Sequence, residues 1–125
     1  MQPARRNLCA FILIASIGAF WSVPTAAAHA ILLESNPALK SAVTGPDVPI
    51  KLRFNVRIDT LRSRLTLIHP DGSAQTLEIS KQTPADTLSA EATDLAAGTY
   101  RLRWQVLASD GHITRGEIPF TVAPS

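Results

Sequence analysis

Apolar and polar residues alternate one by one in three stretches of this chain, and that pattern constrains its fold most strongly. Residues 49–56 read PIKLRFNV, residues 100–106 read YRLRWQV, and residues 117–122 read EIPFTV. Successive side chains of a β-strand point to opposite faces, so this alternation is typical of a strand with one buried face. No stretch of eleven or more residues shows a helical period, and we therefore expect an all-β fold.

Four shorter segments are also candidate strands, and together with the first three they predict about seven strands. They are residues 30–34, 64–68, 75–79 and 87–92. The segments between the candidates carry turn residues, such as HPDGS and AAGT. About seven short strands with regular turn signals predict a β-sandwich of immunoglobulin-like type. Trp104 lies on the apolar side of its strand, so we expect it in the core with a partner for its indole N–H.

The first residues have the three parts of a secretory signal peptide. Arg5 and Arg6 precede an apolar stretch, residues 8–23, and residues 25–28 read TAAA. A positive start, a short apolar core and a small-residue ending define such a signal. A transmembrane anchor is the alternative, but the apolar stretch is short for a span of about 20 residues and no basic cluster follows it. We therefore predict a signal peptide over residues 1–28.

Small residues also place the cleavage site. Ala26 and Ala28 suit positions minus three and minus one, which predicts cleavage between Ala28 and His29. Cleavage after Ala27 is the alternative. Removing 28 of the 125 residues leaves 97, enough for one small domain over residues 29–125.

Cleavage changes the chemistry of the chain as well as its length. Cys9 and Met1 are the only cysteine and methionine, so the shortened chain has no disulfide, thiol or thioether. Two of the 12 basic residues are lost while all 10 acidic residues remain, so the net charge is about zero with neutral histidines. A basic stripe is absent from the sequence, and nucleic acid is an unsuitable partner.

Three histidines remain after residue 28, and two have ordinary explanations. His69 precedes a Pro-Asp-Gly turn, which predicts a solvated turn residue, and His112 by itself is a polar loop residue. However, Asp110 and His112 are two residues apart, and in an extended segment they would point to the same side about 6.5–7 Å apart. Gly111 between them has no side chain to block an ion. The alternative for this segment is a plain Asp-Gly turn.

His29 can supply the further ligands that such a pair needs. As the first residue of a cleaved chain it would carry a free α-amine beside its imidazole, and both nitrogens can bind one metal in a six-membered ring. An α-amine has a pKa of about 7.7–8.0, so a strong Lewis acid can displace its proton near neutral pH. With the imidazole of His112 and the carboxylate of Asp110, the donors are three nitrogens and an oxygen, a set that suits Cu(II).

Both ends of the predicted domain resemble the CopC family of periplasmic copper-binding proteins. The similarity lies in HAILLESNPA, residues 29–38, and in GTYRLRWQVLASDGHITRGEIPFTV, residues 98–122. The resemblance implies a seven-stranded Greek-key sandwich and one Cu(II) per chain. It also implies that the ligands are the amine and imidazole of His29, the imidazole of His112, and Asp110 in a weaker axial role.

Two features found in some members of the family are missing from this sequence. A methionine-rich Cu(I) site is not carried over, because no methionine follows Met1. Some members have an acidic residue shortly after the second strand, whereas Val56 stands at that place here. We therefore expect no accessory carboxylate from this segment.

These observations predict a non-enzymatic periplasmic protein of copper homeostasis and resistance. It would bind copper as a monomer, carry or buffer it, and deliver it to an inner-membrane copper transporter. One alternative is a copper monooxygenase-like enzyme with an N-terminal histidine site, which would need an exposed aromatic substrate face. The four aromatic residues after residue 28 all fall on the apolar sides of their strands: Phe54, Tyr100, Trp104 and Phe120. The other alternative is a metal-free adhesion or chaperone-like sandwich.

Overall fold

A computed structural model describes residues 29–124 of the 125-residue chain. The predicted signal peptide, residues 1–28, lies outside the described residues. The described part contains eight strands and no helix, and therefore no helix suited in length and apolarity to crossing a bilayer. The strands are β1 (Leu32–Asn36), β2 (Ala42–Thr44), β3 (Val48–Phe54), β4 (Ile58–Ile68), β5 (Ala74–Leu77), β6 (Thr87–Ala92), β7 (Gly98–Ala108) and β8 (Ile113–Ala123).

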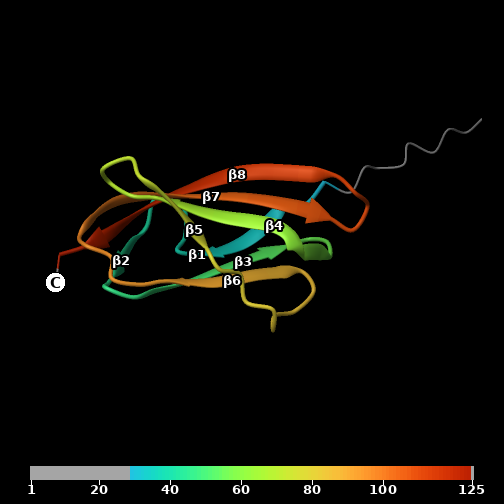
Figure 1. The fold of residues 1–125 in the computed structure, drawn as a ribbon, viewed down its shortest axis with the longest axis horizontal. Coiled ribbons are helices and arrows are strands. Elements are labelled where there is room, and N and C mark those ends of the chain that lie inside the picture. The colour runs from blue at the N-terminus through green and yellow to red at the C-terminus, as the bar shows by residue number, and fades with distance from the viewer. Residues whose placement is uncertain (1–28, 125) are drawn as a thin grey trace, which may run out of the picture.

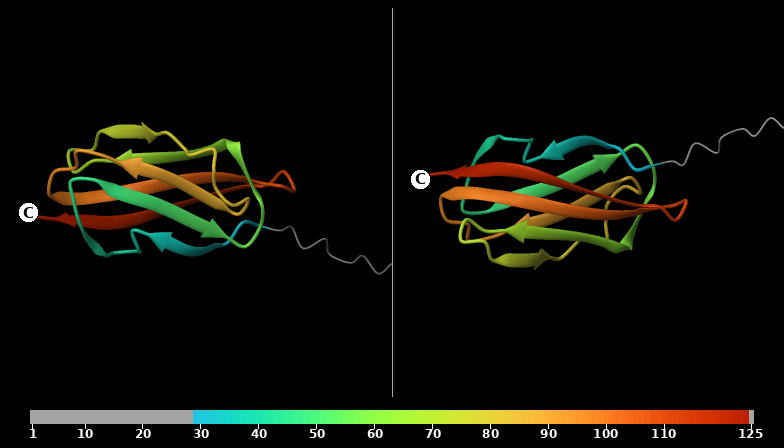
Figure 2. Two further views of the ribbon diagram at one scale, coloured as in Figure 1. Left: turned by 90° about the horizontal axis from the view of Figure 1, so that it is seen from below. Right: turned by 90° about the horizontal axis from the view of Figure 1, so that it is seen from above.

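The strands form two sheets that pack face to face (Figures 1 and 2). The smaller sheet has the order β1-β3-β6, and the larger has the order β2-β8-β7-β4-β5. The chain passes between the sheets at every connection from β1 to β4 and again from β5 to β6 and from β6 to β7, so strands adjacent in sequence are often not neighbours in a sheet. This arrangement confirms the predicted all-β, immunoglobulin-like sandwich.

Alternation in the sequence becomes alternation of burial in the structure. Every second residue of β3 and β7 is buried between the sheets, while the residues between them face outward. Trp104 is 8% exposed, and its ring meets that of Phe54 edge to face with centroids 5.2 Å apart. The prediction of Trp104 as a core residue is confirmed. The expected protein partner for its indole N–H is not found among residues 29–124, where the ring also lines a surface hollow.

A tyrosine at the start of β7 ties the loop before it to the sandwich. Tyr100 is 2% exposed, and its hydroxyl donates a hydrogen bond of 2.8 Å to the carbonyl oxygen of Ala96. A tyrosine whose hydroxyl bonds the backbone a few residues upstream is a hallmark of immunoglobulin-like sandwiches.

The structure differs from the prediction in strand number and in two strand lengths. The eighth strand, β2, has only three residues, too few for alternation to be visible, and it pairs in parallel with β8 at the sheet edge. β4 begins at Ile58 rather than at residue 64, because an irregularity between Asp59 and Arg64 interrupts its alternation. β8 begins at Ile113, four residues earlier than the apolar pattern indicated.

Candidate metal centre

Three segments that are distant in sequence meet at one end of the sandwich. They are the start of the described chain at His29, the β3–β4 connection over residues 55–57, and the β7–β8 turn over residues 109–112. Figures 1 and 2 show the first strand entering beside the β7–β8 turn, at the end opposite the C-terminus. All of the sequence-predicted ligands lie at this end.

The β7–β8 turn holds Asp110 and His112 together through its backbone. The amide of Gly111 donates to the carbonyl oxygen of Ala108, and the amide of Ala108 donates to that of His112, each at 2.9 Å. Gly111 has a φ of 89°, a left-handed conformation that favours glycine. The sequence analysis considered an extended segment for Asp110 and His112, with an Asp-Gly turn as the alternative. The structure shows the turn, which reverses the chain between β7 and β8.

This turn brings the two side chains closer than an extended segment would. The Oδ1 atom of Asp110 accepts a 3.0 Å hydrogen bond from the backbone amide of His112. The Oδ2 atom of the same carboxylate lies 3.0 Å from Nδ1 of the imidazole. The carboxylate therefore fixes both the backbone and the ring of His112, as aspartate does in turns that its own side chain stabilises.

The start of the described chain is held against the β3–β4 connection. Ala30 is 3% exposed and belongs to the core, so the residue before it is fixed at the sandwich end. The backbone amide of Ile31 donates to Oδ1 of Asn55 at 2.7 Å, and the amide of Asn55 donates to the carbonyl oxygen of Ile31 at 3.0 Å. These contacts position the exposed imidazole of His29.

The same connection also holds the β7–β8 turn. The amide of Ser109 donates a 3.1 Å hydrogen bond to the carbonyl oxygen of Arg57. Between Asn55 and Arg57, the side chain of Val56 is half-buried and packs against the core. Residues 55–57 thus join the two ligand-bearing segments. The sequence analysis did not identify this role, which has no local sequence signal because it depends on backbone contacts with distant segments.

The rings of His29 and His112 face each other edge to face, with centroids 5.6 Å apart and an interplanar angle of 64°. An imidazole nitrogen about 2.0–2.1 Å from an ion places the ring centroid about 3.2 Å from it, so two rings on one ion have centroids about 4.5 Å apart at right angles and about 6.4 Å apart in opposite positions. The observed separation falls between these limits.

The distance between Asp110 and His112 also suits two donors on one ion. Two ligand atoms about 2.0–2.1 Å from an ion and at right angles to each other lie about 2.9 Å apart. Nδ1 of His112 and Oδ2 of Asp110 are 3.0 Å apart, and their side chains are 52% and 30% exposed. A solvated ion can reach both atoms without opening the fold.

Three side chains alone do not complete a metal site in the described part of the chain. Over residues 29–124 no group of three His, Cys, Asp or Glu side chains is close enough to hold an ion. In the 125-residue chain His29 is an internal residue, so its nitrogen is an amide rather than the predicted amine. The predicted donor set depends on that amine as well as on the three side chains.

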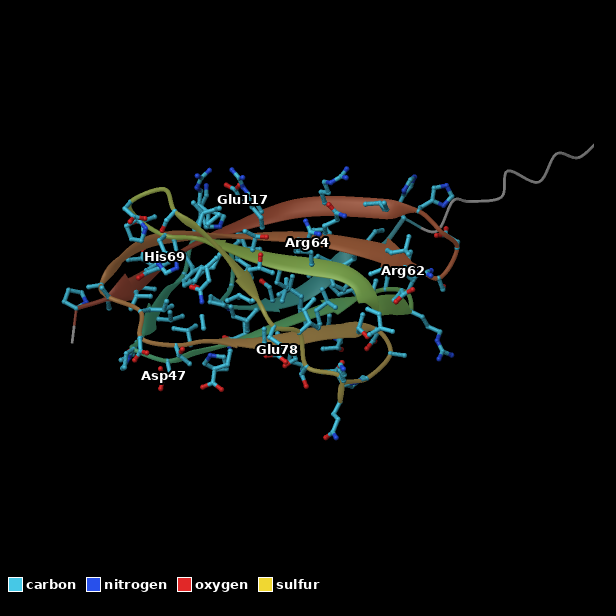
Figure 3. The ribbon with its side chains drawn as sticks, in the orientation of Figure 1. Asp47, Arg62, Arg64, His69, Glu78 and Glu117 are labelled. Atoms are coloured by element: carbon cyan, nitrogen blue, oxygen red, sulfur yellow. The ribbon has the colours of Figure 1, made fainter. Side chains whose placement is uncertain are left out.

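The third histidine, His69, is far from this centre (Figure 3). It follows β4 at the opposite end of the sandwich, where its Nε2 atom lies 2.8 Å from Oε1 of Gln75. Its ring is half-buried against Tyr100, with centroids 5.4 Å apart. His69 is thus a turn residue as predicted, but it is packed rather than fully solvated.

Comparison with known proteins identifies the family. Residues 32–123 match the CopC domain. This chain belongs to the CopC family. The matched residues include Asp110 and His112 and begin just after His29.

Relatives of this CopC-family chain agree with that assignment over most of their length. Protein YobA of Escherichia coli K12 is 31% identical over 102 residues, which cover 79% of this chain and 82% of YobA. The crystal structure of CopC from Methylosinus trichosporium OB3b is similar with a TM-score of 0.69 and 30% identity, covering 77% of this chain and 95% of that one. PcoC of Escherichia coli, described as a methionine-rich copper resistance protein, has a TM-score of 0.63 and 29% identity, covering 77% of this chain and all of PcoC.

Proposed function

We propose that this CopC-family chain is a copper resistance protein that binds one Cu(II) ion at the end of the sandwich. The ligands are the amine and imidazole of His29, the imidazole of His112 and the carboxylate of Asp110. The observation that carries the proposal is the approach of the His29 and His112 rings to 5.6 Å at an exposed end of the fold.

Asp110 keeps the weaker, axial role in this proposal. Nδ1 of His112 and Oδ2 of Asp110 lie 3.0 Å apart, close enough for both atoms to bind one ion. Imidazole and carboxylate both bind metals in their deprotonated forms, so copper would displace any proton that either group carries. The other oxygen of Asp110 stays on the His112 amide, which limits how far the carboxylate can move toward the ion.

The donor types favour Cu(II) over Cu(I). Nitrogen and oxygen donors in a tetragonal set suit Cu(II), whereas Cu(I) prefers thiolates and thioethers. After residue 28 the chain has neither cysteine nor methionine. It differs in this respect from PcoC, which is described as methionine-rich.

A carrier or buffer fits the site better than an enzyme does. All four aromatic residues of the described chain lie in the core, between 1% and 8% exposed, so none of them offers a stacking face to a polysaccharide: Phe54, Tyr100, Trp104 and Phe120. An exposed centre held by three segments allows an ion to exchange with a partner. We infer a non-enzymatic role on these grounds.

The signal peptide over residues 1–28 places the protein in the periplasm in this proposal. Cleavage after Ala28 creates the amine of His29, so export and metal binding are coupled. The domain over residues 29–125 acts as a monomer that buffers copper and delivers it to an inner-membrane copper transporter.

The test is a Cu(II) competition titration on protein recovered from the periplasm, with its N-terminus determined by mass. A second form carries one extra alanine before His29. We expect one tight site in the first form and at least about 100-fold weaker binding in the second, because the extension replaces the amine with an amide. Equal affinity in the two forms would move the site away from the N-terminus.

A matched pair of histidine variants tests the second imidazole ligand. His112→Ala removes a proposed ligand, while His69→Ala removes an imidazole that lies at the opposite end beside Gln75. Copper affinity should fall in the first variant and stay unchanged in the second. Weak binding by the unaltered protein would instead support a metal-free sandwich.

A further inference from the structure

The outer face of the larger sheet carries an unbalanced cluster of arginines. Arg64 on β4, Arg101 and Arg103 on β7, and Arg115 on β8 all point away from the core. We call these four residues the arginine face. Glu117 is the one acidic residue that the strand register places among them, so the net charge of this set is +3.

Strand register places three of these side chains in two adjacent rows, and Arg101 lies in the row after them. Arg64 of β4 is opposite Gln105 of β7, which is opposite Arg115 of β8. In the next row Arg103 lies between Thr66 and Glu117. Arg103 is thus the diagonal neighbour of both Arg64 and Arg115. Diagonal neighbours on adjacent strands are about 7–8 Å apart, within the screening length of about 8–10 Å, so the arginine charges repel one another.

Glu117 neutralises only part of this charge. Its Oε2 atom lies 3.1 Å from Nε of Arg103, and its Oε1 atom lies 3.5 Å from Nη1 of Arg101. Nε of Arg115 donates instead to the neutral Oε1 of Gln105 at 3.0 Å. Within residues 29–124, neither Arg64 nor Arg115 has an acidic group within 4.0 Å.

The charge of this face does not follow from the overall composition. Residues 29–125 contain 10 basic and 10 acidic residues, so the positive excess here is matched by acidic residues elsewhere. Figure 3 shows Arg64 and Glu117 on one side of the sandwich and Asp47 and Glu78 on the other. The smaller sheet is more evenly charged, because Lys51 and Arg53 on β3 lie beside Glu34 on β1 and Glu91 on β6.

A shallow hollow lies within the arginine face. Its volume is about 430 Å³, and its walls include Arg64, Arg103, Gln105 and Arg115, with the edge of Trp104. Such a hollow has room for carboxylate side chains of an extended segment. Guanidinium groups can bind carboxylates through two parallel hydrogen bonds. Glu117, which lines the hollow, shows that a carboxylate is accepted here, because its two oxygens contact two different arginines, Arg101 and Arg103.

The arginine face continues directly into the metal centre. Arg115 lies on β8 three residues after His112 of the β7–β8 turn, a distance of about 10 Å at the usual rise of a strand. Between them Ile113 is 52% exposed and lies opposite Leu107 of β7. A segment lying along β8 over the arginines would thus reach the copper ligands with its next few residues.

We propose that the arginine face docks an acidic segment of the protein that exchanges copper with this chain. The proposal rests on the copper-binding function above and assigns the surface by which the partner approaches. Charge complementarity draws the acidic segment onto β4, β7 and β8, and the same strands present His112 at their end. Exposed opposite charges also speed the encounter of two proteins.

An acidic protein segment fits this face better than an anionic bilayer does. Surfaces that enter a membrane interface present aromatic or clustered apolar side chains. In the described part of the larger sheet the exposed large apolar residues are Leu61 on β4 and Ile113 on β8, and neither is aromatic. The concave shape also favours individual carboxylates over a plane of headgroups.

The test uses metal-free protein that begins at His29, so that docking is measured independently of copper binding. A short synthetic peptide of alternating glutamate and alanine is titrated into isotope-labelled protein, with a matched glutamine peptide as control. We expect the resonances of Arg64, Arg103 and Arg115 to shift with the glutamate peptide alone. The shifts should weaken when the ionic strength rises to about 0.15 M.

Two charge-matched variants make the result specific. One combines Arg64→Gln, Arg103→Gln and Arg115→Gln; the control combines Lys40→Gln, Lys51→Gln and Lys81→Gln, which removes equal charge elsewhere. We expect about tenfold weaker peptide binding in the arginine variant and unchanged binding in the lysine variant. Both variants should keep the copper affinity of the unaltered protein.

Several outcomes would overturn the proposal. Equally weakened peptide binding in the two variants would show that only the overall charge matters. Resonance shifts located away from the arginine face would place docking elsewhere. Arginine-dependent binding to phosphatidylglycerol vesicles without peptide binding would assign the face to a membrane. Absence of copper binding by the unaltered protein would contradict the proposed function. The docking result would still be valid, because it is measured on metal-free protein.

Discussion

Substituting Gly116 with alanine should distort the contact between β7 and β8 near the metal centre. Gly116 lies opposite Trp104 in the strand register, and the indole ring covers it. A Cβ atom at this position would be 2.2 Å from Cζ2 of Trp104 and 2.3 Å from Cε2. Since carbon atoms pack best at about 3.5–4.0 Å, the ring or the strand must move by about 1.3 Å or more.

The size of the effect follows from how tightly that ring is held. Trp104 is 8% exposed and is wedged against Phe54 of the opposite sheet, so it has little space into which to move. Overpacking of a core costs about 1–3 kcal/mol, and we expect Gly116→Ala to lie near the upper end of that range. For a domain of this size that corresponds to a fall in Tm of about 10–20 °C.

Urea unfolding followed by tryptophan fluorescence measures this directly, because Trp104 is the only tryptophan after residue 28. The exposed residue Thr121 on the same strand provides a control, and Thr121→Ala should change the free energy of unfolding by less than about 0.5 kcal/mol. In a Trp104→Phe background the smaller ring should lessen the cost of Gly116→Ala. A loss below about 0.5 kcal/mol with an unchanged emission spectrum would refute the reasoning.

Three further predictions concern other parts of the fold. Asn55→Ala removes the side-chain acceptor that holds the segment after His29, so it should weaken Cu(II) binding in a competition titration. An affinity equal to that of the unaltered protein would contradict this role. Tyr100→Phe leaves a backbone carbonyl without its 2.8 Å partner and should lower the free energy of unfolding by about 0.5–1.5 kcal/mol in urea titrations, whereas a gain in stability would contradict the role of the hydroxyl. The Arg53 guanidinium lowers the pKa of Glu34 below its ordinary value of 4.5, so the ion pair stabilises the fold above that pH and is lost as the pH falls through the lowered pKa. Unfolding curves at pH 6 and pH 3 should therefore show a smaller acid loss in Glu34→Gln than in the unaltered protein, and an equal loss in both would show that this pair does not contribute.

The strands were predictable wherever burial repeats every second residue. The segments of β3 and β7 carry their own evidence, because one apolar face must be buried whichever strands become their neighbours. The short strand β2 and the early part of β4 were not predictable in this way. Three residues are too few to show a period, and the irregularity after Asp59 shifts the faces of β4.

For the site, the sequence alone determined the candidate donors and their chemistry. The small residues before His29 predict the free amine, the Asp110–His112 spacing predicts a pair of donors, and the lack of sulfur after residue 28 excludes soft ligands. Together these features predict nitrogen and oxygen ligands for copper. They identified which side chains could act, but they left open whether the pair lies on an extended segment or in a turn.

Only the tertiary structure decided how these groups meet and what surrounds them. Asn55 and Arg57 join the first residues to the β7–β8 turn through backbone hydrogen bonds, and the register of β4, β7 and β8 gathers arginines from three strands into one face. Such contacts depend on which strands pair and in what register. A local pattern of apolar residues sets which face of each strand is buried, but it does not set its neighbours, because pairing is fixed by the packing of the whole sandwich.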